Sequence, residues 1–192
     1  MIKALYDWTI SLAEHPRALW ALAIVAFVES SVFPIPPDIL MIPMIIAAPT
    51  RAFTIAAVAT VASVLGGMFG YLIGAALFDS IGQPILEFYG KGERMAEFNQ
   101  RFNDFGFWPV LIAGMTPFPY KVITIMSGWT GLPIATFVVT SIIARGARFF
   151  LVSALLWKFG PPMRAFIEKR LGLMFTLFIL LLIGGFYLVR YL

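Results

Sequence analysis

The sequence predicts an all-α integral membrane protein, built as an inverted repeat of two re-entrant helical hairpins that are each followed by a spanning helix, plus a C-terminal spanning helix. Three observations lead to this prediction. The 192 residues are 60% hydrophobic and only 12% charged, whereas soluble domains carry about 25% charged residues. Prolines and charges interrupt two apolar segments whose halves are too short to cross a bilayer. The same proline pattern occurs twice, 83 positions apart.

The composition also excludes several kinds of chemistry. Cysteine is absent, which rules out disulfides, thiolate catalysis and cysteine-ligated metals. The single histidine, His15, makes a multi-histidine metal site or a histidine relay unexpected. The net charge of +4 comes without a basic run, so no nucleic-acid partner is expected. We therefore predict no metal and no cofactor.

Residues 1–17 are predicted to form an N-terminal interfacial helix. Leu5, Trp8 and Leu12 fall at helical spacing, and Pro16 ends the pattern. A frayed terminus fits these residues equally well.

The first re-entrant hairpin is predicted over residues 18–48, in which "VESSVFPIPPDILMIP" breaks an apolar run. A spanning helix needs about 20 residues, and neither Ala18–Phe33 nor Ile39–Ala48 reaches that length. Proline cannot continue a helix through the break. Irregular backbone at membrane depth is tolerated only inside protein or beside a polar cavity. The turn is therefore assigned to Pro34, Pro36 and Pro37, in the interior.

Residues 52–78 form an uncharged run that is long enough to span the membrane with some tilt. Gly66, Gly70 and Gly74 recur every four residues and leave one helix face bare, as in close helix packing. That face packs within one chain or across a homodimer, and both arrangements stay open.

The second half of the chain follows the same plan. An amphipathic surface helix is predicted over residues 84–104. A second re-entrant segment follows over 105–133, with its turn at Pro117 and Pro119, and a span over 134–157. These elements complete a membrane core over residues 18–160. A basic loop and a C-terminal span fill residues 161–192.

Two short motifs reveal the repeat. "PIPPD" ends at Asp38 and "PFPYK" ends at Lys121, and the same 83-residue offset carries the first span onto the second. One span separates the hairpins, so they enter from opposite sides of the bilayer. Inverted repeats of this kind place a binding site near the midplane of many transporters.

The basic residues predict the orientation. One face would carry seven basic residues and the other four. The seven are Lys3, Arg17, Arg51, Lys158, Arg164, Lys169 and Arg170, and the four are Lys91, Arg94, Arg101 and Arg190. The positive-inside rule then places the N-terminus in the cytoplasm.

Five ionisable residues fall inside apolar segments: Glu29, Asp38, Lys121, Arg145 and Arg148. Each costs roughly 2.5–3.5 kcal/mol at the bilayer centre on insertion scales, so they must meet one another, water or a charged substrate. Lys121, Arg145 and Arg148 suit a phosphate. Glu29 and Asp38 form an acidic pair that can exchange protons. The alternative is that all five only neutralise one another as structural ion pairs.

With these motifs, the sequence resembles the DedA family, also called the VTT or SNARE-associated domain family, in its shorter bacterial branch. The resemblance covers roughly residues 15–160 and rests on motif order and spacing. The motifs are "VESSVFPIPPD", "GGMFGYLIG", "GMTPFPYKVITIMSG" and "IIARGARFF". By motif position, Glu29 and Asp38 correspond to the family's acidic pair, and Lys121 to the second basic residue of its second hairpin.

The resemblance implies a bacterial inner-membrane, multi-pass lipid translocase of the flippase or scramblase type. Its substrate would be an anionic lipid phosphate, such as undecaprenyl phosphate or a phospholipid, and protons would be a coupling ion. The chain departs from the family pattern in three ways. Met115 stands where many members carry Arg, Lys replaces Arg at position 121, and the prolines of the second hairpin are shifted. We expect Arg145 and Arg148 to supply the missing charge.

Other functions remain as alternatives. An intramembrane enzyme such as a lipid phosphatase needs a nucleophile beside an acid or base, and no such pattern occurs at usable spacing, so no enzymatic activity is expected. A proton-coupled transporter of ions or small solutes shares the fold. A non-transporting protein that organises the membrane would use the broken hairpins to reshape it.

Overall fold

The computed structural model describes residues 17–33, 36–78, 80, 92–116 and 119–160. Several sequence predictions lie outside these residues. They are the interfacial helix before Arg17, the first part of the surface helix, the turn residues Pro34 and Pro117, and everything after residue 160.

The described residues form helices and contain no strand, which confirms the prediction of an all-helical chain. Their order along the chain is α2 (Ala18–Ser31), α3 (Asp38–Ala47), the short 3₁₀ helix η1 (Pro49–Arg51), α4 (Ala52–Leu77), α6 (Gly92–Asp104), α7 (Trp108–Met115) and α8 (Tyr120–Trp129). A last helix, here called the C-terminal long helix, covers Ile134–Gly160.

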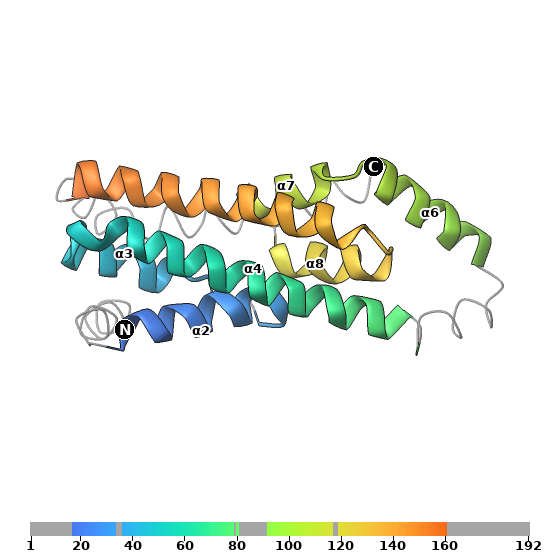
Figure 1. The fold of residues 1–192 in the computed structure, drawn as a ribbon, viewed down its shortest axis with the longest axis horizontal. Coiled ribbons are helices and arrows are strands. Elements are labelled where there is room, and N and C mark those ends of the chain that lie inside the picture. Colours follow the sequence, from blue (N-terminus) through green and yellow to red (C-terminus); the bar gives the residue numbers. More distant parts are fainter. Residues whose placement is uncertain (1–16, 34–35, 79, 81–91, 117–118, 161–192) are drawn as a thin grey trace, which may run out of the picture.

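Two of these elements are long and apolar enough to cross a membrane: Pro49–Leu77, which combines η1 and α4, and the C-terminal long helix. They run side by side in opposite directions along the longest axis (Figure 1). The short helices α2 and α3 lie towards one end of this pair, whereas α7 and α8 lie towards the other end (Figure 1).

Proline explains where the short helices stop and start. A residue that precedes proline is disfavoured in the helical region, and Thr116, before Pro117, is extended with ψ 170°. Pro37 and Pro119 are the N-caps of α3 and α8, where the missing N–H of proline costs no helical hydrogen bond. Each break therefore separates two half-length helices by local backbone chemistry.

The glycine face of α4 brings both sets of short helices close. A Cβ on Gly66 would overlap the backbone of Phe27 in α2, and a Cβ on Gly74 would overlap the backbone of Ile125 in α8. A Cβ on Gly70, between them, would overlap the side chain of Thr124. The three glycines thus pack against helices of the same chain, and backbone-to-backbone contact fixes how near α2 and α8 lie to α4.

Buried apolar side chains form two clusters, and polar residues occupy the level between them. One cluster includes Ile55, Ala59 and Phe149, and the other includes Tyr120 and Phe137. On both long helices a group of buried polar residues falls between the positions that join the two clusters. This group consists of Thr60 and Ser63 on α4, and Thr140, Ser141 and Arg145 on the C-terminal long helix. Ser153 is also buried, beyond Phe149 on the same helix.

The outer surface is apolar. Large hydrophobic side chains are exposed along both long helices: Val61, Leu65, Phe69, Leu72, Val139, Ile142, Ile143 and Leu151. A soluble protein rarely exposes so continuous an apolar patch. Buried charge beneath an apolar surface is the distribution that a lipid environment favours.

Glycine at position 131 allows the chain to turn sharply after α8. Gly131 has φ +70°, and the N–H of Leu132 donates to the carbonyl of Ser127 at 2.9 Å, as in a Schellman C-cap. Nothing lies within 4 Å of a Cβ at this position.

Gly131→Ala is expected to destabilise the fold by about 1 kcal/mol through backbone strain alone. The midpoint of thermal unfolding in detergent would measure it, and Gly131→Asn, which tolerates this conformation, is expected to lose less. Equal midpoints for all three proteins would contradict this interpretation.

Candidate functional site

A buried ion pair joins the first short helix to the C-terminal long helix. Nη2 of Arg145 donates to Oε2 of Glu29 at 2.8 Å. The Arg145 side chain is 1% exposed and that of Glu29 is 15% exposed. Since an isolated charge is costly in a medium of low dielectric constant, each of these groups depends on the other.

The Arg145 guanidinium is held on several sides. Its Nε donates to Oγ of Ser63 in α4 at 2.6 Å. Its carbon Cζ lies 4.8 Å from the ring centroid of Tyr120 and 4.6 Å from that of Phe149, within the range of cation–π attraction. The remaining nitrogen, Nη1, is buried without a hydrogen-bond partner. The group is therefore fixed in place while it retains unused donors.

A second ion pair lies one helical turn further along. Nη2 of Arg148 donates to Oδ2 of Asp38 at 2.7 Å, and its Nη1 donates to the carbonyl of Thr116 at 3.4 Å. Asp38 begins α3, and Thr116 follows α7. Arg148 thus connects the two helix breaks. This pair is more open than the first, with side chains 23% and 20% exposed.

Lys121 has a different environment from the arginines. Its Nζ donates to the carbonyl of Val32 at 3.4 Å, in an exposed position. Val32 is the C-cap of α2, where unsatisfied carbonyls carry partial negative charge. Within the described ranges, Lys121 forms no ion pair with a carboxylate. It is the cation of the five-residue cluster that an anion reaches without displacing a carboxylate.

Hydroxyl groups that were not predicted from the sequence complete the site. Oγ of Ser30 lies 2.6 Å from Oγ of Ser63 and 3.0 Å from Oε2 of Glu29. Because Ser63 accepts from Arg145, its own proton is free to point to Ser30, which then donates to Glu29. Thr124 of α8 donates to the carbonyl of Ser30 at 3.1 Å. Serine and threonine are common in membrane helices, so their presence alone does not indicate a site. Only their position on the same helix face as an ionisable residue could have indicated that these hydroxyls belong to the site.

The structure thus brings the two breaks and the five ionisable residues to one level of the molecule. Arg145 lies within electrostatic reach of Glu29, Arg148 and Asp38, and Lys121 reaches the end of α2. Pro36, Pro37 and Pro119 flank the breaks. The arginines assigned to phosphate occupy ion pairs with the carboxylates assigned to protons. An anion therefore gains full access to them only when a carboxylate moves away.

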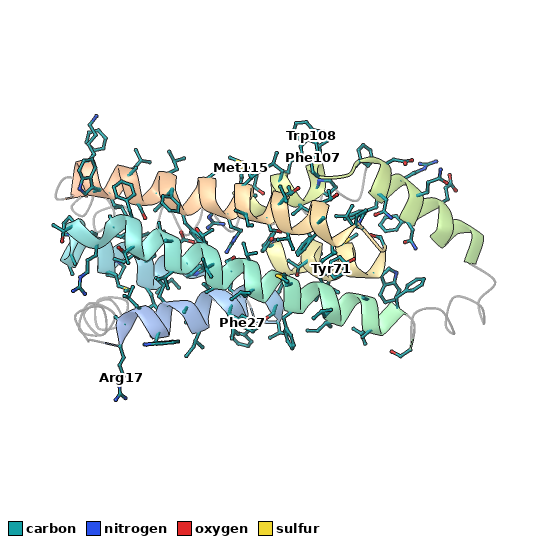
Figure 2. All side chains as sticks on the ribbon, viewed as in Figure 1. Arg17, Phe27, Tyr71, Phe107, Trp108 and Met115 are labelled. Atoms are coloured by element: carbon teal, nitrogen blue, oxygen red, sulfur yellow. The ribbon has the colours of Figure 1, made fainter. Side chains whose placement is uncertain are left out.

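Met115, the position at which the family pattern carries Arg, ends α7 and is 49% exposed (Figure 2). The carbonyl of the next residue, Thr116, accepts from Arg148. A guanidinium from the C-terminal long helix therefore lies beside the position that lacks one.

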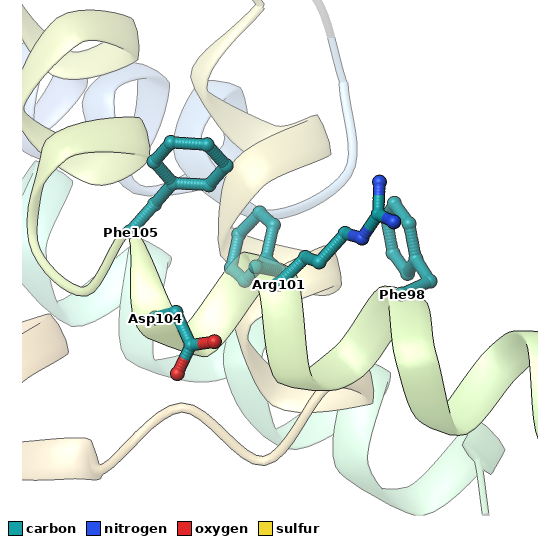
Figure 3. Close-up of a pocket in the computed structure, with 5 residues that line it drawn as sticks. Phe98, Arg101, Asp104 and Phe105 are labelled. Atoms are coloured by element: carbon teal, nitrogen blue, oxygen red, sulfur yellow. The ribbon is translucent and has the colours of Figure 1, made fainter.

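Two further features bear on ligands. In the part of the chain that is described, no three His, Cys, Asp or Glu side chains lie close enough to hold a metal. A surface pocket of about 580 Å³ lies on α6 (Figure 3), lined by Phe98, Arg101, Phe102, Asp104 and Phe105. None of these five residues belongs to the ion-pair cluster.

Comparison with known proteins places the core of the chain in a family. Residues 35–158 match the VTT domain. An uncharacterized protein from Haemophilus influenzae is 37% identical over 168 residues, which cover 85% of this chain and 87% of that protein. A second uncharacterized protein, from Histophilus somni, is 39% identical over 168 residues with the same coverage of 85% and 87%. No solved structure matches the chain.

Proposed function

Because the chain belongs to the VTT domain family, the DedA family of membrane proteins, we propose that it is a lipid translocase that moves an anionic lipid phosphate across the bacterial inner membrane. The substrate class is a polyprenyl phosphate or a phospholipid. The headgroup binds Lys121, Arg145 and Arg148, while the acyl or prenyl chains stay in the bilayer.

One observation carries this proposal: the cluster has unused donors and an excess of positive charge. Three cations face two carboxylates, Lys121 forms no ion pair with a carboxylate among the described residues, and Nη1 of Arg145 has no partner. A purely structural set of ion pairs would be expected to balance its charges. A phosphate supplies negative charge opposite this excess and accepts hydrogen bonds from the free donors.

Helix ends add to the attraction for an anion. Lys121 lies in the first turn of α8, where the helix itself carries partial positive charge. The corresponding position of the first repeat unit is Asp38, which neutralises the start of α3. The two units therefore differ at this position, and α8 is the one that favours an anion.

We infer a membrane arrangement from the order and lengths of the helices. The α2–α3 and α7–α8 units act as re-entrant hairpins of an inverted repeat and enter from opposite sides, with the N-terminus in the cytoplasm. Supporting this arrangement, α2, α3, α7 and α8 are each too short to span, and the two units lie towards opposite ends of the long helices (Figure 1). The two breaks then meet near the midplane, where transporters of this design bind substrate.

The acidic pair gives the transporter a means of coupling to protons. A phosphate that binds an arginine competes with Glu29 or Asp38, and a displaced carboxylate can take up a proton. Binding of the phosphate and protonation of the displaced carboxylate then promote each other, as thermodynamic linkage requires. We propose no enzymatic reaction. The second candidate function is a proton-coupled transporter of small anions, because the donors that bind a lipid phosphate also suit an inorganic phosphate.

The direct test is headgroup transport in proteoliposomes that contain undecaprenyl phosphate. Lys121→Ala is expected to slow flipping about 10–100-fold, because hydrogen bonds to charged groups contribute about 1.5–3 kcal/mol and each 1.4 kcal/mol is tenfold. Lys121→Arg should retain most activity, since it keeps the charge. Arg51→Gln, an exposed cation at the start of the first long segment, serves as the matched control and should leave flipping unchanged.

The same vesicles separate the candidate functions. If wild-type protein moves neither undecaprenyl phosphate nor a glycerophospholipid, lipid transport is wrong. Uptake of inorganic phosphate in that case would favour the small-anion transporter. A Lys121→Ala protein that folds and flips at the wild-type rate would remove this residue from the headgroup site.

A further inference from the structure

The two carboxylates of the cluster lie at opposite ends of their helices. Glu29 is in the last turn of α2, which ends at Ser31, and Asp38 is the first residue of α3. A helix carries partial negative charge at its C-terminus and partial positive charge at its N-terminus. The backbone therefore opposes a negative charge on Glu29 and supports one on Asp38.

Glu29 depends chiefly on one cation. Arg145 of the C-terminal long helix and Tyr120 of α8 interact electrostatically with Glu29. Arg148 of the C-terminal long helix, Lys121 of α8 and Asp38 of α3 are the other charged groups of the cluster. α4 contributes the hydroxyl of Ser63 at this level. Among the described residues, only Arg145 forms an ion pair with Glu29. Removal of that contact leaves Glu29 with the Ser30 hydroxyl and an unfavourable helix end.

Arg145 is held independently of Glu29. Its Nε remains bonded to Ser63, and its guanidinium remains between the rings of Tyr120 and Phe149. An anion that takes the place of the Glu29 carboxylate thus meets a cation that does not have to move. The carboxylate that leaves is the partner that changes its environment.

Asp38 responds differently to the loss of its arginine. Its carboxylate stays at the N-terminus of α3, where the partial positive charge of the helix stabilises a negative charge. The two acidic residues therefore have unequal roles, although the family pattern presents them as a pair.

We propose that Glu29 is the carboxylate that takes up the coupling proton and that Asp38 stays ionised throughout the transport cycle. This inference rests on the proposed function for its physiological meaning. One proton from water binds Glu29 as one negative charge binds Arg145, so a phosphodiester headgroup enters without a change in the total charge of the site. Release of the headgroup returns the proton and restores the ion pair.

Two single variants test this inference without any lipid. Arg145→Gln and Arg148→Gln each remove one cation, and infrared spectroscopy detects the C=O stretch of a protonated carboxyl group. At pH 7 we expect that band in Arg145→Gln and not in Arg148→Gln. The double variant Arg145→Gln/Glu29→Gln should lose it. A band in Arg148→Gln, or its absence from Arg145→Gln, would overturn the proposal.

Wild-type protein provides a second measurement that needs no stable variant. Short-chain phosphatidylglycerol, whose phosphodiester keeps a single charge near neutral pH, is added to protein labelled with ¹³C in either glutamate or aspartate carboxyl groups. The new protonated-carboxyl band should shift with the glutamate label alone. A band that shifts with the aspartate label, or lipid binding without any band, would contradict the assignment. If the wild-type protein moves neither undecaprenyl phosphate nor a glycerophospholipid in the vesicles but Arg145→Gln shows the band, the proposed function fails while the role of Glu29 stands.

Discussion

Gly66→Ala and Gly74→Ala, combined in one chain, are expected to abolish the folded protein. Each added Cβ would overlap backbone atoms, of Phe27 in α2 and of Ile125 in α8. Ordinary overpacking costs about 1–3 kcal/mol because side chains shift to make room. Backbone atoms of a packed helix cannot shift in that way, so each substitution should exceed this range. The recovery of monodisperse protein in mild detergent would measure the effect.

A matched glycine on the C-terminal long helix controls for helix propensity. A Cβ on Gly146 would lie 3.8 Å from Cγ2 of Thr60, an ordinary contact. Gly146→Ala should therefore leave the protein folded and raise its stability by about 0.5–1 kcal/mol, the usual gain from replacing glycine within a helix. Wild-type recovery of the Gly66→Ala/Gly74→Ala protein would mean that α2 and α8 do not pack on α4 as described.

The broad plan of the fold could be predicted from sequence because its causes are local. Clustered prolines interrupt a helix through local sterics, whereas the single Pro43 lies within α3. The apolar run of residues 52–78 needs no partner to be recognised as a helix of spanning length. The all-helical chain and the two long apolar helices follow from these signals. Membership of the VTT family likewise follows from motif order, which is a property of the sequence.

The partners within the site could not be predicted in the same way. Arg145 and Arg148 are three residues apart and occupy one face, so either could have met either carboxylate. The choice depends on how far α2 and α3 reach along the C-terminal long helix, and that position results from packing between helices, such as the contact of Gly66 with Phe27. The role of Ser63 could not be predicted from the sequence either. In the sequence Ser63 is one hydroxyl in an apolar helix, and only the fold places it against Arg145.

The buried ion pair leads to the prediction with the second-largest effect. Glu29→Met is expected to destabilise the protein by about 3–5 kcal/mol, the usual cost of leaving one member of a buried pair without its partner. Arg145 is 1% exposed, and arginine cannot become neutral by losing a proton. The charge therefore remains in the interior, satisfied only by Ser63 and the two aromatic rings.

Arg145→Met should lose less stability than Glu29→Met, because the buried carboxyl group of Glu29 can become neutral by binding a proton, whereas a guanidinium cannot lose one. The loss of stability in Arg145→Met should shrink further as the pH falls. The double variant Glu29→Met/Arg145→Met should recover most of the lost stability, since apolar replacement of both members of a buried pair is often neutral. Thermal unfolding of the four proteins in one detergent completes a double-mutant cycle. Additive losses would show that the two side chains do not interact, whereas a larger loss in Arg145→Met than in Glu29→Met would show that Glu29 stays ionised without its cation.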